Sequence, residues 1–235
     1  YIDFLIKCES RNYLTLSEMR TLLGRMFRAS MTLPQGSKAF LGGILKLIRK
    51  CRLPSHRQRL TQAVKSDIRR LINLLEANQG CGYFDVSHLP WFPAIYTDAM
   101  KDNSSAGWGW CCENGEFDYG LYDRKHRRMY IDALEGDAVV RAVTSLGDQL
   151  KGHRVPIHID NSAFQLSLTK GWSKADRLTE QIKILHELSV KHDCYFIPIW
   201  ISTHDNVGAD ALSRLDLERF HEWASSKLTG PLRRH

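Results

Sequence analysis

The sequence predicts an α/β domain, with a mixed five-stranded sheet flanked by helices, behind a small, basic, mostly helical module. Three observations support this prediction. After residue 90, short apolar runs bounded by turn residues alternate with longer segments of helical periodicity. Residues 1–90 show mainly helical periodicity. Charge also divides there: residues 1–90 carry 15 Lys and Arg against 6 Asp and Glu, whereas residues 91–235 carry 18 against 20.

The composition limits the class of protein. With 235 residues, 43% of them hydrophobic, the chain is long enough for one large domain or two small ones. No apolar run approaches the roughly 18 residues of a membrane span, so we expect no membrane partner. Charged Asp3, Lys7 and Glu9 argue against a signal peptide. The six cysteines form no C-x-x-C pair, so we expect free thiols in an intracellular protein, cytoplasmic or nuclear and not secreted.

The first module, residues 1–90, is predicted to begin with a β-hairpin. Two short apolar runs, 1–6 and 13–16, surround a polar segment. A capping box from Thr15 to Glu18 then begins a helix, with Leu14 and Met19 placed for a hydrophobic staple. The predicted inward residues of this helix are Leu16, Met19, Leu22, Leu23, Met26 and Phe27.

Two more helices are predicted in this module. Pro34 and Gly36 separate the first helix from a second over 37–51. A capping box from Ser55 to Gln58 begins the third, which ends near residue 78. Glycines at positions 80 and 82 then terminate it.

The second and third helices are rich in basic side chains. Such a density can follow a phosphate backbone, with an affinity that falls as salt rises. Aromatic residues are sparse among them, so base stacking is not indicated. A solvated helical surface is the alternative, and charge alone does not decide between the two. The basic residues are Lys46, Arg49, Lys50, Arg52, Arg57, Arg59, Lys65, Arg69 and Arg70.

The second domain, residues 91–235, follows a linker over 81–93. Its first three strands form an antiparallel meander, and glycines in the second strand permit close backbone approach. Later strands alternate with helices, which makes the sheet mixed. The predicted strands are 94–100, 106–112, 116–121, 155–160 and 194–201, and the predicted helices are 132–150, 161–169, 174–192 and 207–223.

Four acidic residues occupy notable positions in these elements. Asp98 lies in the first strand and Asp160 ends the fourth. Glu135 lies in the first turn of a helix, and Asp210 lies in the last helix. Sites in such sheets gather at the carboxyl ends of strands, so the four carboxylates are predicted to converge. They would repel one another unless divalent cations neutralised them, and carboxylate oxygens suit magnesium or manganese.

Each acid also has an ordinary structural explanation. Glu135 could complete a helix cap with Asp132, and Asp160 could cap the helix that follows it. Asp210 could be a surface acid and Asp98 an exposed strand end. Their occurrence together, in this order of elements, favours one shared site.

The motifs around these acids resemble the ribonuclease H domain of retroelement reverse transcriptases, of the DIRS-like or gypsy-like kind. The resemblance covers roughly residues 91–225, and the motifs occur in the family's order. They are Thr97-Asp98-Ala99, Gly107-Trp108-Gly109, Leu134-Glu135, Ile159-Asp160-Asn161-Ser162 and Asp205-Asn206-Val-Gly-Ala-Asp210-Ala-Leu-Ser-Arg214.

This resemblance implies an endoribonuclease that cleaves the RNA strand of RNA–DNA hybrids. It implies two Mg²⁺ ions, replaceable by Mn²⁺, with Asp98 as a ligand of both. Asp210 would hold the ion that activates water, while Glu135 and Asp160 would hold the ion at the leaving oxygen. Asn161 and Asn206 are implied to contact nucleic acid.

This chain departs from the family's pattern at a histidine that usually precedes the last acid. Its common position, ten residues before Asp210, is Trp200 here. His204 lies in the same loop and is the candidate substitute. An exposed loop histidine without a catalytic role is the alternative.

The first 90 residues carry a similarity of their own. Residues 1–16 are similar to the primer-grip hairpin of a polymerase palm, and the helical module to a thumb and connection. We expect that this chain does not polymerise by itself, and that the polymerase part of a reverse transcriptase is a partner.

Two other functions stay open from the sequence. One is a DNA nuclease of the same fold, such as an integrase or resolvase, which usually needs three acids. The other is a non-catalytic, domesticated scaffold that binds nucleic acid or protein; retention of four acids argues against it. Four tryptophans are expected in the core, with stacking platforms as the alternative: Trp91, Trp108, Trp110 and Trp172.

Overall fold

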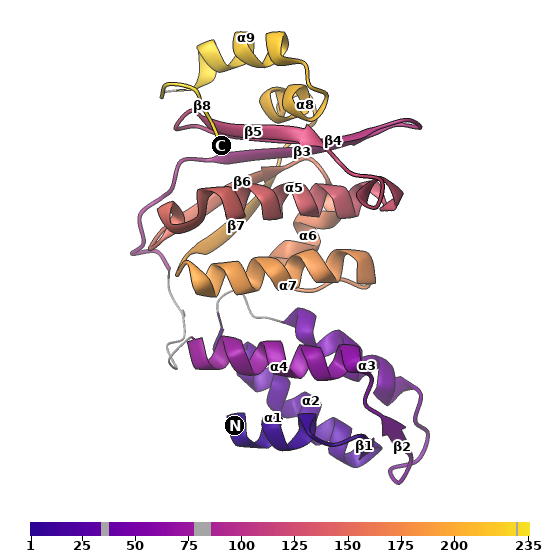
Figure 1. Cartoon of the computed structure of the whole chain (residues 1–235). Helices are drawn as coiled ribbons and strands as arrows, with labels where there is room; N and C mark the ends of the chain where they lie inside the picture. Colours follow the sequence, from indigo (N-terminus) through magenta and orange to yellow (C-terminus); the bar gives the residue numbers. More distant parts are fainter. Residues whose placement is uncertain (34–37, 78–85, 229) are drawn as a thin grey trace. The chain divides into compact units, whose positions relative to one another are not determined.

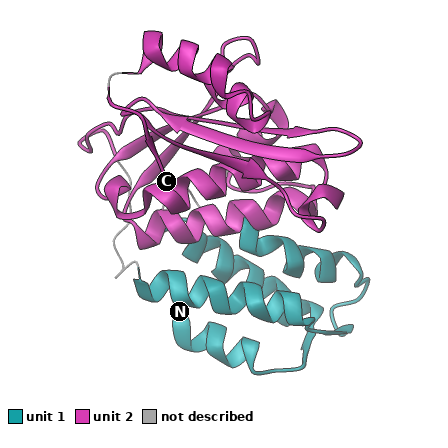
Figure 2. Ribbon diagram, turned by 45° about the horizontal axis from the view of Figure 1, so that its top comes forward, with its two compact units in different colours: residues 1–85 teal, residues 86–235 magenta. Residues whose placement is uncertain are grey.

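The computed structural model describes residues 1–33, 38–77, 86–228 and 230–235. The chain divides into two compact units, residues 1–85 and 86–235 (Figure 2). The predicted break at Pro34 and Gly36, and the predicted helix end at residues 78, 80 and 82, lie outside the described residues.

Unit 1 is mostly helical, as expected. A short two-stranded sheet joins β1 and β2 in antiparallel pairing, with Tyr13 opposite Arg59. Its elements are α1 (Ile2–Glu9), β1 (Tyr13–Thr15), α2 (Leu16–Ser30), the 3₁₀ helix η2 (Lys38–Leu41), α3 (Gly42–Arg49), β2 (Arg57–Arg59) and α4 (Gln62–Ala77).

The predicted N-terminal hairpin is wrong, because residues 2–9 form α1. Leu5 and Cys8 are buried three residues apart, on one face of that helix. A short apolar run is compatible with a strand or a buried helix turn, and here the tertiary contacts with α4 select the helix. The strand partner of β1 comes instead from β2, more than forty residues later.

The first capping box is confirmed and the second is wrong. The Thr15 hydroxyl accepts a hydrogen bond from Glu18 N at 3.2 Å, and the Glu18 carboxylate accepts one from Thr15 N at 2.7 Å. Gln58 lies in β2, and α4 begins only after Thr61, whose hydroxyl accepts from Val64 N at 3.3 Å. Pairing with β1 therefore overrides the local capping signal.

Other details of unit 1 also differ from expectation. Phe27 was predicted to face inward, but it is 45% exposed, because Met19, Leu22 and Met26 already fill the buried stripe of α2. The predicted helix over 37–51 consists of η2 followed by the shorter α3.

Unit 2 contains the mixed sheet, so the predicted fold class is confirmed. Strand order is β7-β6-β3-β4-β5-β8, with β3 antiparallel to β4 and parallel to β6. The sheet has six strands rather than five, because the pair of residues in β8 joins the edge of β5. The strands are β3 (Ile95–Lys101), β4 (Ala106–Cys112), β5 (Glu116–Leu121), β6 (Arg154–Ile159), β7 (Tyr195–Trp200) and β8 (Arg233–Arg234).

Helices cover both faces of this sheet. On one face α5 (Ile131–Leu146) packs against β3, and α7 (Asp176–Lys191) packs on α5 (Figure 1). On the other face α8 (Val207–Ser213) contacts β3 and β4, with α9 (Leu217–Lys227) beside it (Figure 1). The short α6 (Ser162–Lys170) follows β6. The central strand β3 is therefore enclosed between α5 and α8.

Two predicted helices of unit 2 are interrupted. The helix over 132–150 ends at Leu146, where Gly147 adopts φ +49° and a 3₁₀ turn, η4 (Gly147–Leu150), follows. The last helix over 207–223 is two helices, α8 and α9, separated by Leu215 at φ +62°. Apolar residues continue on both sides of that break, so periodicity alone did not reveal it.

Glycines in β4 let α8 lie directly on the sheet, which confirms the predicted close approach. A Cβ at Gly109 would come within 2.4 Å of Leu212 Cβ and 2.6 Å of Ser213 N. A Cβ at Gly107 would come within 2.0 Å of Ser213 O. Larger residues here would push α8, which carries Asp210, away from the strand.

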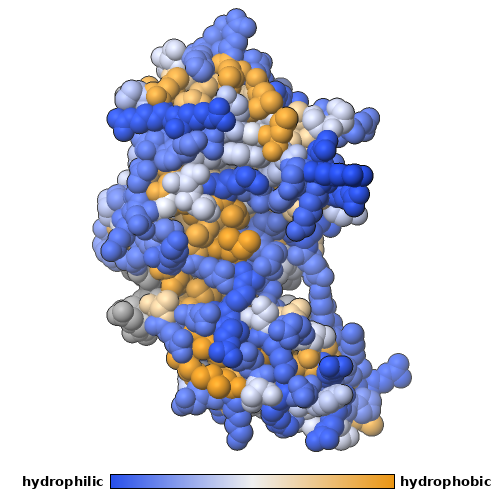
Figure 3. Space-filling model, in the orientation of Figure 1, coloured by the Kyte–Doolittle hydropathy of each residue, from blue (hydrophilic) through white to orange (hydrophobic). Residues whose placement is uncertain are grey.

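The tryptophans divide between core and surface. Trp110 is fully buried and Trp108 is 9% exposed, as expected for core residues, whereas Trp91 and Trp172 are 55% and 41% exposed. The five described cysteines are free. The face in Figure 3 is mainly hydrophilic with smaller hydrophobic areas. Among the described residues, no helix has the length and apolarity to cross a membrane.

We predict that Gly109→Ala destabilises unit 2 by about 1–3 kcal/mol, since its Cβ would overlap the α8 backbone. All six tryptophans lie in residues 91–223, so tryptophan fluorescence during urea unfolding follows this unit. Gly24→Ala is the control, because a Cβ there meets nothing within 4 Å. Equal stability of Gly109→Ala and the parent chain would contradict the packing argument.

Candidate active site

Asp98 lies in the middle of the central strand and is only 4% exposed. In the ladder it is opposite Gly109. Its Oδ2 accepts a short hydrogen bond from the Ser213 hydroxyl of α8. The glycines of β4 make this contact possible, because they bring α8 against the strand.

Glu135 approaches Asp98 from α5, on the face of the sheet opposite to α8. It lies near the start of α5, close to the Ala99 backbone, and it is 4% exposed. Its Oε2 is buried without a hydrogen-bond partner. A buried carboxylate oxygen without a partner is costly, so this atom requires a proton or a cation.

Asp160 follows the last residue of β6, the parallel neighbour of β3. Because Thr97 pairs with Ile159, Asp98 and Asp160 lie side by side just beyond the last paired residues of the two strands. The Thr203 hydroxyl donates to Asp160 Oδ2 at 3.0 Å. Trp200 Nε1 donates to the Asp160 carbonyl at 3.1 Å.

These three acids converge, although they are widely separated in sequence. One carboxylate oxygen from each of Asp98, Glu135 and Asp160 lies within 4.8 Å of the others. A set of hard oxygen donors with one unpaired member fits a divalent cation such as Mg²⁺ or Mn²⁺.

Asp210, the fourth predicted acid, is held differently. It is 6% exposed and lies on α8. Its Oδ1 accepts from Arg214 Nε and its Oδ2 from Arg219 Nη1, both at 2.7 Å. The group of three acids does not include it.

Burial and the crowding of negative charges raise the pKa values of the carboxyl groups at this site. Burial, opposed by the Ser213 hydrogen bond and reinforced by the charges of Asp160 and Asp210, raises the pKa of Asp98 to about 6. Burial first, then the charges of Asp98 and Asp160, raises the pKa of Glu135 well above its usual range. Burial also raises the pKa of Asp160.

The polar residues in the two loops near the acids have distinct positions. His204 is exposed and follows Thr203, which contacts Asp160. Asn206 was expected to contact nucleic acid, but it is fully buried and its Nδ2 donates to the Thr97 carbonyl at 2.9 Å. It therefore ties the start of α8 to the central strand, which corrects that expectation.

Asn161 has the capping role that the sequence had left open for Asp160. Its Oδ1 accepts from Phe164 N at 3.0 Å and caps α6. The Asp160 carboxylate is thus not used in the cap and takes part in the acid cluster.

Sequence reasoning missed the side chains that hold the acids. Ser213 and Arg214 belong to the motif that ends in Arg214, and this was the available signal for them. Arg219 and Thr203 carried no such signal, because their contacts depend on the turn between α8 and α9 and on the loop after β7.

A basic groove lies at the same end of the sheet as the acids. It is about 450 Å³ in volume and includes Lys101, three residues after Asp98 on β3. Arg127 Nη1 donates to the Ser104 carbonyl at 2.9 Å across it. Its lining residues are Lys101, Asp102, Asn103, Ser104, Ser105, Arg124, Arg127 and Arg128.

Unit 1 carries basic side chains on two surfaces. The predicted residues Lys46, Arg49 and Lys50 are exposed on and just after α3. Arg52 is exposed too, as are Arg57 and Arg59, which lie on β2 and not on a helix as expected. Arg69 pairs with Glu9 at 2.6 Å.

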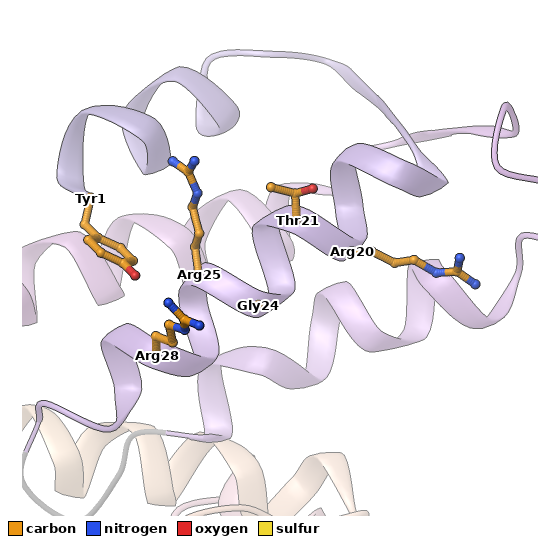
Figure 4. A pocket seen from close by; sticks show the side chains of 6 residues that line it. All are labelled: Tyr1, Arg20, Thr21, Gly24, Arg25 and Arg28. Carbon is orange, nitrogen blue, oxygen red and sulfur yellow. The ribbon is translucent and has the colours of Figure 1, made fainter.

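The second basic surface of unit 1 was not predicted. It is a hollow of about 490 Å³ along α2, lined by Tyr1, Arg20, Thr21, Gly24, Arg25 and Arg28. Figure 4 shows Tyr1, Arg25 and Arg28 grouped near one end, with Arg20 further along the helix. The Arg25 guanidinium lies 3.8 Å from the centre of the Phe4 ring. No described residue forms an ion pair with these three arginines.

Comparison with known proteins gives structural matches only. No protein-family model matches the chain, and no curated protein matches its sequence. Ribonuclease H1 from Halobacterium salinarum is similar at 21% identity and TM-score 0.46, covering 54% of this chain and 97% of its own. The N-terminal ribonuclease H domain of a Mycobacterium tuberculosis protein is similar at 14% identity and TM-score 0.40, covering 57% and 96%.

A longer match extends over both units. The foamy viral protease-reverse transcriptase, in complex with an RNA/DNA hybrid, is similar at 12% identity and TM-score 0.31. The match covers 86% of this chain and 27% of the viral protein.

We predict that Asp98→Asn stabilises the metal-free chain at neutral pH. The pKa of Asp98 is raised in the folded state, so its effect on stability is absent below about pH 4 and becomes destabilising as pH rises toward 6 and above. Removing the charge should raise the free energy of unfolding at pH 7 by about 1–3 kcal/mol. Asn retains an acceptor for Ser213.

Urea unfolding in a chelator, measured between pH 4 and 8, tests this. The parent chain should lose stability across the interval and the variant should lose less. Asp118→Asn is the control, since Asp118 pairs with Arg234 at 3.1 Å and its loss should not stabilise the chain. An Asp98→Asn chain less stable than the parent at pH 7 would refute the electrostatic account.

Proposed function

We propose that this chain is an endoribonuclease that cleaves the RNA strand of RNA–DNA hybrids, as part of a retroelement reverse transcriptase. The observation that carries the proposal is the convergence of Asp98, Glu135 and Asp160, with the Glu135 Oε2 buried and unpaired. Two buried acids and one half-buried acid that bring oxygens within 4.8 Å of one another are expected to destabilise a fold, so their presence indicates a functional site. The motif resemblance supplies the substrate class.

The acids are assigned to two magnesium ions, for which manganese would substitute. Asp98 would contact both ions, Glu135 and Asp160 the ion at the leaving 3′ oxygen, and Asp210 the ion beside the attacking water. Bound there, the ions supply charge neutralisation and a water of lowered pKa. Ser213 and Thr203 hold two of the carboxylates in place by hydrogen bonds.

Selection of RNA requires a contact with the ribose 2′-hydroxyl, which distinguishes it from DNA. We assign that contact to Glu135. His204 is exposed beside Thr203, and we assign it a role in positioning water or releasing product. The products would be a 5′-phosphate and a 3′-hydroxyl.

Substrate affinity is assigned to basic surfaces outside the acid cluster. The groove that contains Lys101 and Arg128 would contact phosphates near the cut. The basic side chains of unit 1, with its thumb-like and connection-like character, would contact the duplex backbone elsewhere. The partner that polymerises would be the rest of the reverse transcriptase.

One observation favours a second candidate function, a scaffold that binds nucleic acid without cutting it. Both oxygens of Asp210 accept hydrogen bonds from arginines, as in a purely structural ion pair. A DNA nuclease of the same fold remains a third candidate. Metal dependence and strand choice separate the three.

We predict that the chain cuts only the RNA strand of a labelled RNA–DNA hybrid in Mg²⁺, and that Asp160→Asn lowers the rate about 100-fold or more. Loss of a ligand to a catalytic ion removes several kcal/mol of transition-state stabilisation. Asp118→Asn is the matched acid-to-amide control, on β5 of the same sheet.

Strand-resolved gels give each alternative its own result. Binding of the hybrid without cutting in Mg²⁺ or Mn²⁺ would establish the scaffold. Cutting of double-stranded DNA would establish the DNA nuclease. RNA cutting that survives Asp160→Asn unchanged would refute the assignment of the acids.

We predict that replacing Arg49, Lys50 and Arg52 by Gln weakens hybrid binding and flattens its salt dependence. The slope of log K against log salt is negative, and each lost phosphate contact should make it less steep by about 0.9. Fluorescence anisotropy at salt concentrations from about 50 to about 200 mM measures the affinity for the hybrid and its dependence on salt.

Two comparison variants locate the binding surface. The same replacement at Arg20, Arg25 and Arg28 tests the hollow on α2. A charge-matched control replaces three exposed lysines of unit 2, Lys151, Lys170 and Lys191. An unchanged slope for the Arg49, Lys50 and Arg52 variant would remove that surface from the proposal.

A further inference from the structure

Two guanidinium groups donate hydrogen bonds to the Asp210 carboxylate, one to each oxygen. Arg214 Nε lies 2.7 Å from Oδ1, and Arg219 Nη1 lies 2.7 Å from Oδ2. These are charge-assisted hydrogen bonds of the strong class. The Asp210 side chain is 8% exposed, whereas those of Arg214 and Arg219 are 54% and 44% exposed. The acid is therefore enclosed, while both arginines remain open to solvent.

The second arginine reaches Asp210 only because the chain reverses direction. Arg214 is four residues after Asp210, a spacing that pairs side chains in any helix. Arg219 is nine residues away, in the first turn of α9. Leu215 adopts φ +62° between the helices, which is unfavourable for a residue other than glycine. Asp216 then caps α9 by accepting from Arg219 N at 3.2 Å.

The arginines separate Asp210 from the other acids in function. Asp98, Glu135 and Asp160 offer oxygens within 4.8 Å of one another, and this group can hold one cation without Asp210. A second ion would need an oxygen of Asp210. Each oxygen keeps a second lone pair, but the two guanidinium charges beside the carboxylate repel a cation. The two arginine charges thus neutralise the Asp210 carboxylate, as a second divalent ion would otherwise do.

We propose that Arg214 and Arg219 form a gate on Asp210, which keeps the second metal ion out until nucleic acid is bound. This inference rests on the proposed function. A phosphodiester offers guanidinium groups an alternative partner of matching geometry. When a phosphate of the substrate draws the arginines away, Asp210 is released to the second ion. Both arginines are positioning residues, since they act through Asp210.

The gate couples metal binding to substrate binding. The free chain binds one ion, and the second ion binds together with the nucleic acid. Because such coupling is reciprocal, the second ion also strengthens substrate binding. An isolated chain would then lack a complete two-ion centre.

Counting bound Mn²⁺ on the full chain, without nucleic acid, tests the gate. Calorimetry, with free Mn²⁺ measured in parallel by its paramagnetic resonance signal, gives the number of ions. We expect one ion for the parent chain and two for a chain carrying Arg214→Gln and Arg219→Gln. Arg234→Gln is the matched control, because Arg234 pairs with Asp118 and is 52% exposed. It should bind one ion.

The outcomes of this experiment test the gate separately from the metal site of Asp98, Glu135 and Asp160. One ion in both the parent chain and the double variant, or two ions in the parent, overturns the gate and leaves the metal site intact. No ion in either chain overturns the metal site, and the gate with it. Asp98→Asn identifies the site, because it should abolish the single ion of the parent chain.

A milder variant covers the case in which the double variant does not fold. Arg219→Lys retains the charge but loses the planar fork that fits a carboxylate. We expect it to bind a second ion over the Mn²⁺ range in which the parent chain binds one. It should also lower the Mg²⁺ concentration for half-maximal cleavage. One ion over that range and an unchanged Mg²⁺ concentration together overturn the gate.

Discussion

The candidate site depends on one electrostatic constraint: the carboxylates of buried Asp98 and Glu135 and of half-buried Asp160 each bring an oxygen within 4.8 Å of the others. Burial and mutual repulsion both disfavour their ionised forms. Hydrogen bonds from Ser213 to Asp98 and from Thr203 to Asp160 offset part of this cost. Glu135 Oε2 still has no partner in the protein, so this oxygen is available to a cation. A divalent cation is the solution that also provides chemistry.

The sheet supplies the geometry that this constraint requires. Asp98 and Asp160 end up adjacent because β3 and β6 are parallel neighbours. Glu135 approaches from α5 on one face, and α8 lies on the other, against the glycines of β4. Each carboxylate belongs to a different element, so the cluster is rigid only if all of those elements pack correctly. Substitutions far from the acids in sequence, as at Gly109, therefore reach the site through backbone packing.

The fourth acid shows a different solution to the same electrostatic problem. Asp210 is neutralised by Arg214 and Arg219 rather than by a shared cation. Guanidinium groups can exchange a carboxylate for a phosphate, so this neutralisation is reversible by substrate. In the proposed gate, one set of charges serves stability in the free chain and substrate recognition in the complex.

The sequence by itself determined the five longer strands of unit 2 and the capping box at Thr15, and it singled out the four acids as candidates. The apolar runs and turn residues marked 106–112 and 116–121 to the residue, since these are local signals. Tertiary structure decided what local signals leave ambiguous. It made residues 2–9 a helix and split the last helix at Leu215. It also turned Asn206 inward, because packing of α8 on the sheet brings this residue to Thr97. It brought Arg219 to Asp210, because the turn between α8 and α9 places the two side chains together.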